Sequence, residues 1–397
     1  MGSFVDIAIS GGGVAGLTAA AAFGSAGFSV LCVDPTPPVT TAEAEGADLR
    51  STAFLQPSVR VLQDAGLWDR LAPHAAALQV MRIVDAGDPM TDLRATKDFD
   101  AAEVSDLPFG WNLPNWLLRR EMLARIAEIP GIAFRPGVGF AGMLARDNVA
   151  LVRLTDGSRV SARLVIGADG RASAVRQAAG IAVRTLRYGQ KAIVFAVTHA
   201  APHDNTSTEV HRSGGPFTLV PLPDIDGRPA SSVVWMDDGA AITALAALPD
   251  DAFGAAATER SGLVLGPLTV ASARQVWPII SQMALQLTAP RVALMAEAAH
   301  VMPPIGAQGL NMSLADLAVL LDLARTRPAE IGAPRWLDAY ARRRQPNIAL
   351  RVAGIDALNR ASIAGPQPLR DLRAVGLRAL HDIRPLRRAL MRLGLGV

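Results

Sequence analysis

The sequence predicts an α/β fold in which an antiparallel sheet interrupts a parallel sheet of βαβ units, with a helical segment at the C-terminal end. Residues 4–34 have the pattern of a strand, a glycine turn, an Ala-rich helix and a second strand. Residues 149–166 have a hairpin pattern, and residues 191–198 and 231–236 alternate as strands, with links rich in Pro, Gly and Asp between them. From residue 291 the pattern returns to strand, loop and helix.

These patterns predict three parts of the chain. A discontinuous first domain is expected to comprise residues 1–75, 110–185 and 275–340. A second domain, built on the antiparallel sheet, is expected to comprise residues 76–109 and 186–274, and a helical segment covers 341–397. A chain of 397 residues is long enough for this arrangement.

Composition excludes several classes of protein. The net charge of +3 gives no electrostatic footprint for nucleic acid, so no nucleic-acid partner is expected. Cys32 is the only cysteine, which rules out an intrachain disulfide and a cysteine-based metal site, and no metal is predicted. Its apolar strand context predicts a buried, inert thiol.

The apolar N-terminal stretch lacks the basic region of a signal peptide, so we expect a cytoplasmic protein, soluble or peripheral on the inner face of a membrane.

The first motif is SGGGVAG at residues 10–16, between a strand and a helix. Gly11 would permit a tight turn, Gly13 a close approach of backbone to a pyrophosphate, and Gly16 close helix–strand packing. The helix N-terminus presents unpaired N–H groups to the phosphates. Asp34 ends the second strand, where a carboxylate can accept ribose hydroxyls. The candidate dinucleotide contacts are therefore Gly11, Gly13, Ala15, Gly16 and Asp34.

The second motif is an apolar strand that ends in Asp169-Gly170 and leads through a polar turn to a helix carrying Arg176. It has two equally weighted interpretations. One is an ordinary Asp-Gly turn, and the other is a second turn that contacts the nucleotide.

The third motif spans residues 296–311. A strand delivers Glu297, prolines stiffen the loop, and Gly309-Leu310-Asn311 opens a helix that Asn311 could cap. A helix N-terminus aimed at the pyrimidine edge of a flavin would stabilise the negative charge that develops on reduction. This motif favours FAD over NAD. His300 is interpreted as a hydrogen-bonded loop residue rather than a metal ligand, since no second ligand stands at metal spacing.

In this order and spacing, the three motifs resemble the class A flavoprotein monooxygenases typified by para-hydroxybenzoate hydroxylase, from about residue 4 to residue 345. The resemblance implies a Rossmann-like FAD-binding domain of the GR2 type with an inserted substrate-binding sheet. It also implies that Arg50 and an arginine opening a later helix, Arg119 in preference to its neighbour, reach FAD. It places the Pro304 carbonyl beside the reacting ring. Arg176 is either a contact for a transient nicotinamide nucleotide or an arginine on the helix surface.

Within that superfamily the chain most resembles the ubiquinone-biosynthesis ring hydroxylases. The similar segments are RSTAFLQPSVRVLQDAGLW (50–68), FGWNLPNWLLRR (109–120), EAAHVMPPIGAQGLNMSLAD (297–316) and DAYARRRQPN (338–347). The resemblance implies FAD as cofactor, NAD(P)H and O2 as co-substrates, a flavin C4a-hydroperoxide as oxidant and a prenylated phenol as substrate. The family usually has Gly-Asp where this chain has Ala296-Glu297, and the longer acid keeps the charge that faces the ribitol.

Other functions stay open at this stage. They are hydroxylation of another small aromatic compound, a reductase or dehydrogenase of the same fold, and a non-enzymatic subunit of a biosynthetic complex. The C-terminal stretch 369–395 combines an apolar stripe with seven arginines and two aspartates. Such a helix either lies on an anionic membrane surface or packs on its own FAD domain or a partner subunit, in a homo-oligomer or a complex.

Overall fold

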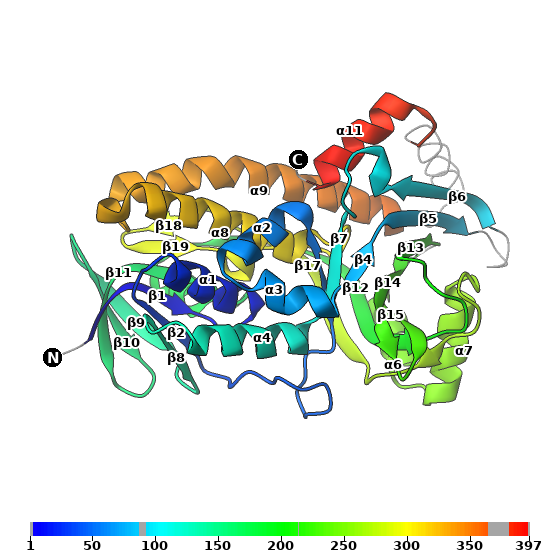
Figure 1. Ribbon diagram of the computed structural model, residues 1–397, viewed down its shortest axis with the longest axis horizontal. Coiled ribbons are helices and arrows are strands. Elements are labelled where there is room, and N and C mark those ends of the chain that lie inside the picture. Colours follow the sequence, from blue (N-terminus) through cyan, green and yellow to red (C-terminus); the bar gives the residue numbers. More distant parts are fainter. Residues whose placement is uncertain (1–2, 87–92, 213, 364–380, 396–397) are drawn as a thin grey trace.

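The structure is a computed structural model that describes residues 3–86, 93–212, 214–363 and 381–395 (Figure 1). The strands in these ranges form two large sheets and one small sheet. Figure 1 shows the first large sheet at the end of the molecule that holds the N-terminus and the second large sheet at the opposite end, where α11 lies above β5 and β6.

The first large sheet has a parallel centre. Its strands are β1 (Ser3–Ser10), β2 (Val30–Asp34), β8 (Ile132–Pro136), β9 (Phe140–Ala145), β10 (Ala150–Leu154), β11 (Arg159–Gly167), β18 (Thr288–Ala289) and β19 (Val292–Leu294). The order β19-β11-β1-β2-β8 is parallel throughout, and β9, β10 and β18 pair antiparallel at its margins. Ile7 on β1 pairs with Leu164 on one side and Val30 on the other. Strands β2 and β19 and the carboxyl halves of β1 and β11 are apolar and buried on both faces, as in a covered parallel sheet.

Helices surround this sheet. They are α1 (Val14–Ser25), α2 (Gln56–Asp64), α3 (Trp68–Leu71), α4 (Asn115–Ala127), α5 (Ala174–Ala178), α8 (Gln308–Thr326) and α9 (Pro334–Ile363). Helix α1 is apolar on all sides, and its alanines at 19–22 and Phe23 have no exposed surface. Their small side chains let α1 lie close to β2 while it contacts α2, α4 and α8. The glycine turn before α1 is therefore held between the sheet and the helical layer.

The second large sheet is mainly antiparallel. Its strands are β5 (Val80–Ala86), β6 (Leu93–Asp100), β12 (Val183–Thr198), β13 (Thr206–His211), β14 (Pro216–Ile225), β15 (Arg228–Asp238), β16 (Thr269–Val270), β17 (Gln275–Ala284) and β20 (His300–Val301). The order is β20-β17-β12-β15-β14-β13-β5-β6, and β13 and β5 pair parallel. Helices α6 (Gly239–Ala246) and α7 (Asp250–Arg260) complete its core, in which Phe195 meets Phe253 edge to face.

A small antiparallel sheet connects the two large ones. It contains β3 (Ser51–Leu55), β4 (Ala76–Leu78) and β7 (Gly110–Pro114). The remaining elements are the 3-10 turns η1 (Ala72–His74), η2 (Ala101–Glu103), η3 (Ala296–Ala298) and η4 (Pro328–Glu330), and the helix α11 (Arg384–Leu395). Short β20 belongs to the second sheet although it lies inside the third sequence motif, so this motif joins both large sheets.

The predicted α/β class is confirmed, with its parallel sheet, its antiparallel sheet and its C-terminal helices. Cys32 is fully buried, as expected. The division into domains stays a prediction. Part of the predicted C-terminal stripe lies outside the described residues, namely Leu369, Leu372, Val375 and Leu380 with Arg370, Arg373 and Arg378.

Candidate functional site

The carboxyl ends of the parallel strands bring the predicted motifs to one edge of the first sheet. Strand β1 runs into Gly11, β2 ends at Asp34, β11 is followed by Asp169, and β19 by Glu297. Because β1, β2, β11 and β19 are parallel, their carboxyl ends lie along the same edge. Open α/β sheets bind ligands in the crevice outside this edge.

The glycine turn has the geometry that its sequence predicts. Gly11 has φ +117°, and a Cβ there would lie 2.2 Å from the Ala168 carbonyl oxygen. A Cβ on Gly16 would lie 1.9 Å from the Gly11 carbonyl oxygen, so α1 can approach β1 only with glycine at this position. A Cβ on Gly13 would meet nothing within 4 Å, which leaves the space before α1 open.

Helix α1 begins without a side-chain cap. Its N-cap residue is Gly13, and its first turn, which contains Ala15, has no acidic side chain. The first N–H groups of the helix therefore keep their capacity to bind an anion. Asp34 lies beside this turn, where its Oδ2 accepts the Gly12 N–H at 2.5 Å and its Oδ1 accepts the Thr36 N–H at 2.8 Å.

The Asp-Gly turn lies against the glycine turn. Asp169 Oδ2 accepts the Ser10 hydroxyl at 3.3 Å and the Val175 N–H at 3.1 Å. The other oxygen of the carboxylate, Oδ1, is buried and has no hydrogen-bond partner in the described part of the chain. The structure thus brings the first two motifs together.

Arg176 is buried, with 5% of its surface exposed, so the alternative of an arginine on the helix surface is wrong. Its guanidinium donates to the carbonyls of Ala298 at 2.9 Å and Arg171 at 2.7 Å. Burial lowers the pKa of this guanidinium, and Asp169 partly offsets the effect. Arg176 therefore links the Asp-Gly turn to the third motif. These two carbonyls satisfy the buried guanidinium, so the side chain can point into the protein from the short helix α5.

The third motif folds as η3, β20, a loop over residues 302–307 that leads into α8 (the α8 loop) and the start of α8. Helix α8 begins at Gln308, and its N-cap residue is Ala307 in the left-handed conformation, with no side-chain cap and no acid in the first turn. The expectation that Asn311 caps the helix is therefore wrong. Asn311 lies inside the first turns, where Nδ2 donates to the Ala53 carbonyl at 2.7 Å and Oδ1 accepts the Leu55 N–H at 2.8 Å. These bonds fasten α8 to β3.

A buried ionic network lies behind the third motif and was not predicted. Asp316 on α8 has no exposed surface, and its carboxylate accepts His300 Nε2 and Arg344 Nε, each at 2.7 Å. It also accepts the Ala296 N–H at 3.2 Å. Burial alone would raise the pKa of Asp316, but His300 and Arg344 outweigh this effect and hold the pKa below its ordinary value. The interpretation of His300 as a hydrogen-bonded loop residue is confirmed.

The network also supports an unusual backbone conformation. Ala296 has φ +56°, a region that favours glycine, and the bond from its N–H to Asp316 helps to hold it there. This is one of the two positions at which the chain differs from the Gly-Asp pair typical of the resembled family. The neighbouring Glu297 is exposed.

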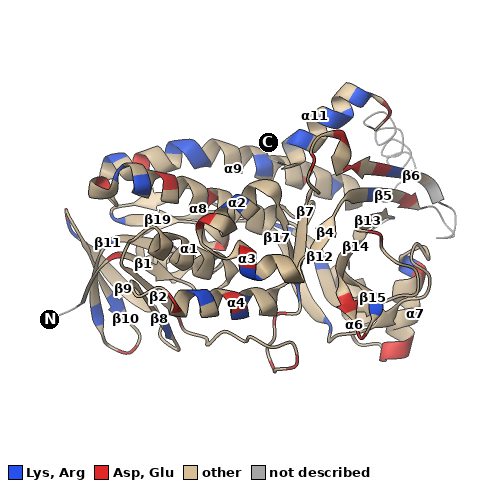
Figure 2. Ribbon diagram, viewed as in Figure 1, with Lys and Arg blue, Asp and Glu red and all other residues tan. Residues whose placement is uncertain are grey.

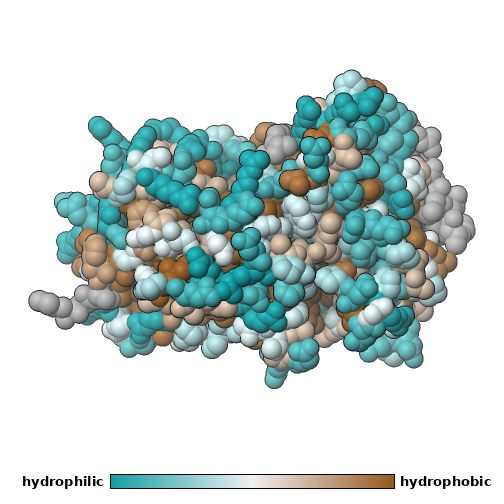
Figure 3. Space-filling view, viewed as in Figure 1, coloured by the Kyte–Doolittle hydropathy of each residue, from teal (hydrophilic) through white to brown (hydrophobic). Residues whose placement is uncertain are grey.

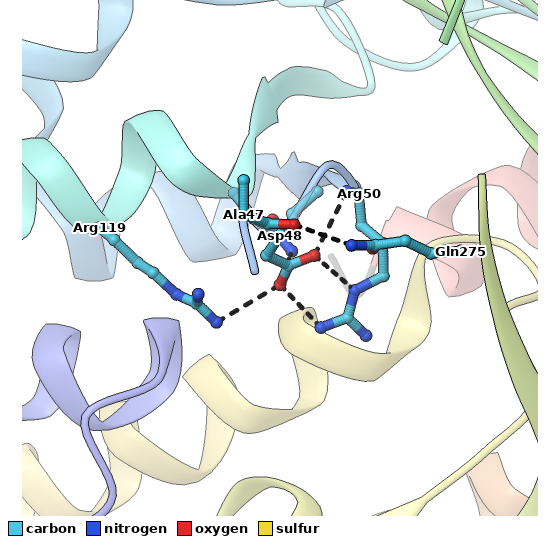
Figure 4. Close-up of polar contacts among 7 residues, drawn as sticks. Ala47, Asp48, Arg50, Arg119 and Gln275 are labelled. Carbon is cyan, nitrogen blue, oxygen red and sulfur yellow. Dashed lines mark hydrogen bonds and ion pairs between the residues drawn. The ribbon is translucent and has the colours of Figure 1, made fainter. Parts of the chain in front are cut away.

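Asp48 brings together the two arginines that sequence reasoning assigned to the cofactor (Figure 4). Its carboxylate accepts Arg50 Nε and Nη2, both at 2.8 Å, and Arg119 Nη2 at 3.4 Å. Asn115 is a third residue that donates to this carboxylate, from Nδ2 at 3.0 Å. Burial would raise the pKa of Asp48, yet these partners lower it below its ordinary value. An acid two residues before a predicted arginine was a signal that could have revealed this cluster.

The Arg50 guanidinium also faces the second sheet and the third motif. It lies 4.5 Å from the centre of the Trp277 ring on β17, a cation–π contact. Burial would lower the pKa of Arg50, but Asp48 and, more weakly, Glu297 raise it. Figure 4 shows Gln275, also from β17, reaching the Ala47 carbonyl, at 2.8 Å. Arg50 therefore lies between Asp48, the second large sheet and the η3 turn that carries Glu297.

The remaining predicted positions lie on the accessible side of the loop. Pro304 and Gly309 are exposed, and Leu310 is half-buried against the main core.

In the described ranges, no group of three or more His, Cys, Asp or Glu side chains could hold a metal ion. Within the same ranges, no helix has the length and apolar character needed to cross a bilayer.

Comparison with known proteins reveals close similarity in sequence. Residues 4–353 match the model of a family described as FAD binding domain. The chain is 35% identical over 394 residues to the ubiquinone hydroxylase UbiL of Rhodospirillum rubrum, covering 98% of this chain and 89% of that protein. It is 28% identical over 395 residues to the 3-demethoxyubiquinol 3-hydroxylase of Escherichia coli K12, covering 99% and 98%.

Solved structures share the fold. The p-nitrophenol 4-monooxygenase PnpA of Pseudomonas putida superposes with a TM-score of 0.80 at 18% identity, over 100% of this chain and 99% of that one. The flavin-dependent monooxygenase PieE, solved with FAD and substrate, superposes with a TM-score of 0.73 at 22% identity, over 99% of this chain and 71% of that one. At these identities the likeness concerns the fold.

Proposed function

This chain belongs to the FAD-binding-domain family, and on that premise we propose that it hydroxylates the aromatic ring of a prenylated phenol in ubiquinone biosynthesis. It is an FAD-dependent monooxygenase, with NAD(P)H as the co-substrate that reduces the cofactor. The observation that carries the choice of substrate is the 35% identity, over 98% of the chain, to a ubiquinone hydroxylase. A bacterial 3-demethoxyubiquinol 3-hydroxylase and a mouse ubiquinone biosynthesis monooxygenase, 27% identical over 439 residues, support it.

The residues at the carboxyl edge fit FAD. The space above Gly13 is open, the N-terminus of α1 has no side-chain cap, and one oxygen of Asp169 is buried without a partner in the described residues. A pyrophosphate would accept hydrogen bonds from the free N–H groups of α1, and a hydroxyl of the cofactor would donate to the unpaired oxygen of Asp169.

In the proposed arrangement the N–H groups of α1 at Gly13 and Ala15 bind the pyrophosphate, and Asp34 accepts the adenosine ribose hydroxyls. Arg50 and Arg119 supply positive charge, and Asp48 keeps both guanidinium groups in place. Asp169 and Glu297 serve the ribitol side. Asp169 lies two residues after β11 and Glu297 three residues after β19, so these neighbouring parallel strands set their spacing.

The N-terminus of α8 would stabilise the charge of the reduced cofactor electrostatically. Gly309 and Leu310 lie in its first turn, where the N–H groups have no side-chain cap and no acid competes for them, and Asn311 follows them. They would stabilise negative charge on the pyrimidine edge of the reduced cofactor. When bound, reduced FAD would supply the two electrons that activate O2, of which one atom enters the ring and the other leaves as water. The exposed Pro304 would orient the phenol through its carbonyl, and the second sheet would exclude water from it.

Glu297 provides a direct test of the cofactor site. Glu297→Ala is expected to raise the Kd for FAD by roughly tenfold, about 1.4 kcal/mol, because it removes a charged hydrogen-bond acceptor. Glu297→Asp, which keeps the charge, should change the Kd by less than about threefold. Titration of FAD-depleted protein, followed by quenching of flavin fluorescence, measures both. Equal losses in the two variants would mean that the charge of Glu297 is not what FAD requires.

The reaction is tested with the purified holoenzyme. We expect NAD(P)H oxidation that a short-chain prenylated phenol stimulates, with a product heavier by about 16 mass units, the mass of one oxygen atom. An FAD-free variant should show neither activity. NAD(P)H oxidation without O2 consumption would instead favour a reductase or dehydrogenase, and no turnover with any phenol would favour a non-enzymatic subunit.

The pathway is tested separately in the host. Deleting the gene should make a quinone precursor that lacks one ring hydroxyl accumulate, as identified by mass spectrometry. Unchanged ubiquinone with an active hydroxylase would assign the enzyme to another small aromatic substrate.

We also propose that the enzyme works peripherally on the inner face of a membrane. A polyprenylated phenol resides in the bilayer, because each buried CH2 group stabilises it there by about 0.8 kcal/mol. The enzyme must then reach its substrate at the lipid surface, and its described helices offer no span through it. Association as a homo-oligomer or within a biosynthetic complex stays a prediction.

A further inference from the structure

Helix α11 turns apolar side chains outward. On its inner side Met391 and Leu395 are buried, with 7% and 3% of their surface exposed. Ile383, just before the helix, and Leu386 and Leu390 within it are spaced three and four residues apart, so they follow one face. They are 52%, 39% and 37% exposed. A helix packed on a globular protein normally turns its apolar stripe toward the core, and among the described residues this stripe lacks that partner.

The same helix carries a high positive charge of its own. Its sequence RPLRRALMRLGL contains four arginines and no acid. One of them, Arg387, is paired with Glu103, at 2.6 Å for Nη2 and 3.0 Å for Nε. Arg384 and Arg392 are exposed. Figure 2 shows the basic residues along α11, and in Figure 3 brown apolar atoms lie among teal hydrophilic atoms over the same helix.

Contacts on the inner side fix α11 to the second sheet. Besides the pair between Arg387 and Glu103, Lys97 on β6 binds Asp382 at 2.7 Å, and His381 approaches the Asp98 carbonyl at 3.1 Å. These bonds use the inner side and the residues just before the helix. They leave the stripe Ile383-Leu386-Leu390 facing away from the protein.

The far end of α11 reaches the α8 loop. Gln308, the first residue of α8, donates from Nε2 to the Gly394 carbonyl at 3.5 Å, and its Oε1 accepts Arg351 Nη1 at 2.6 Å. Pro304, four residues before Gln308, is exposed. A surface that binds α11 would therefore lie beside the loop proposed to orient the phenol.

We propose that the apolar outward face of α11, formed by Ile383, Leu386 and Leu390, docks on an anionic lipid bilayer together with the exposed Arg384 at the start of the helix and Arg392 near its end. The apolar side chains enter the interface, and the arginines bind lipid phosphates. A second copy of the chain is disfavoured as the occupant, because a two-fold contact through α11 would bring like charges together. This docking surface rests on the proposed function. Helix α11, which contacts the first residue of α8, would place the neighbouring α8 loop at the membrane that contains the substrate.

Vesicle co-sedimentation of the full-length holoenzyme tests this. The probes are vesicles of phosphatidylcholine alone and of phosphatidylcholine with an equal part of phosphatidylglycerol. We expect binding to the anionic vesicles only, weakened by salt. Leu386→Gln/Leu390→Gln and Arg384→Gln/Arg392→Gln should each lower the partition coefficient by roughly tenfold or more.

Helix α9 supplies matched controls. Leu350 and Leu358 are 70% and 57% exposed, so Leu350→Gln/Leu358→Gln changes the same chemistry at another surface. Arg335 and Arg342 are also exposed, so Arg335→Gln/Arg342→Gln is the matched charge control. Both control pairs should bind vesicles like the parent. Equal losses in the α11 and α9 pairs, unchanged binding of the α11 pairs, or a dimer that the α11 leucine pair converts to monomer would overturn the proposal.

Activity on a short-chain, water-soluble phenol separates the two hypotheses. The α11 variants should keep this activity while losing activity on a long-chain phenol embedded in vesicles. Vesicle binding as expected without any hydroxylation would refute the proposed function alone. Hydroxylation of the soluble phenol with vesicle binding that ignores α11 would refute the docking surface alone.

Discussion

Replacing Asp316 by alanine is expected to lower the free energy of unfolding by about 3–5 kcal/mol, because it leaves buried charge without its partner. The carboxylate has no exposed surface and is the acceptor that joins Arg344, His300 and the Ala296 N–H. Arg344 is only 5% exposed and would lose its counter-ion. Chemical denaturation followed by tryptophan fluorescence measures the change.

Asp322 provides the control on the same helix. Its carboxylate pairs with Arg343 at the surface, where the two side chains are 50% and 47% exposed. Asp322→Ala should therefore change the unfolding free energy by less than about 1 kcal/mol. Equal losses of unfolding free energy in the two variants would contradict the expectation that the buried network around Asp316 stabilises the fold more than a surface ion pair does.

The network also predicts a response to acid. The pKa of Asp316 in the folded protein lies below its ordinary value. Its contribution to stability is therefore fully present above the unfolded pKa of about 3.9 and is lost as the pH falls through the lower, folded value. Asp316→Asn should remove this part of the acid sensitivity, so the difference in unfolding free energy between parent and variant should shrink as the pH falls below about 4.

Gly16→Ala is expected to abolish stable FAD binding, with a rise in Kd on the order of a hundredfold, about 2.7 kcal/mol. The new Cβ would lie 1.9 Å from the Gly11 carbonyl oxygen, which is backbone and cannot rotate away. The start of α1 must then move off β1, and its N–H groups leave the place where the pyrophosphate would bind. The flavin absorbance that remains with the purified protein, together with FAD titration, gives the result.

Gly354 on α9 is the matched control, because a Cβ there would meet nothing within 4 Å. Gly354→Ala should leave FAD binding unchanged and, since alanine favours helix, should be neutral or slightly stabilising. A Gly16→Ala protein that retains its full complement of FAD would show that the glycine turn is not the cofactor site.

Features that depend on near neighbours in the chain were predictable. Gly11, Gly16 and Asp34 act within one βαβ unit, and each needs only a local turn or strand end to take its position. The left-handed φ of Gly11 and the close approach at Gly16 both followed from this frame. The α/β class followed for the same reason, since its strands and helices show their own periodicity.

Features that depend on partners far along the chain were not predictable. Asp48 binds an arginine 71 residues away, and Asn311 binds the backbone of β3, more than 250 residues earlier. A polar residue near the start of a helix was expected to cap it, but tertiary contacts with β3 took the side chain instead. Arg176 became buried because the Ala298 carbonyl, 122 residues further on, accepts its guanidinium. The hydrophobic periodicity of a segment predicts its own secondary structure, but not which distant residues its side chains will contact.

Cys32 makes this chain convenient for site-specific labelling. The only thiol of the sequence is fully buried on β2, where Sγ lies 3.6 Å from the Gly11 carbonyl oxygen. Burial, reinforced by the Asp34 carboxylate, raises the pKa of this thiol, so little of the nucleophilic thiolate forms at neutral pH. A cysteine introduced at Leu386 would then be the single reactive site for a nitroxide or a fluorophore, with no background mutation needed. Spectroscopy on such a protein could report the polarity around α11 during turnover.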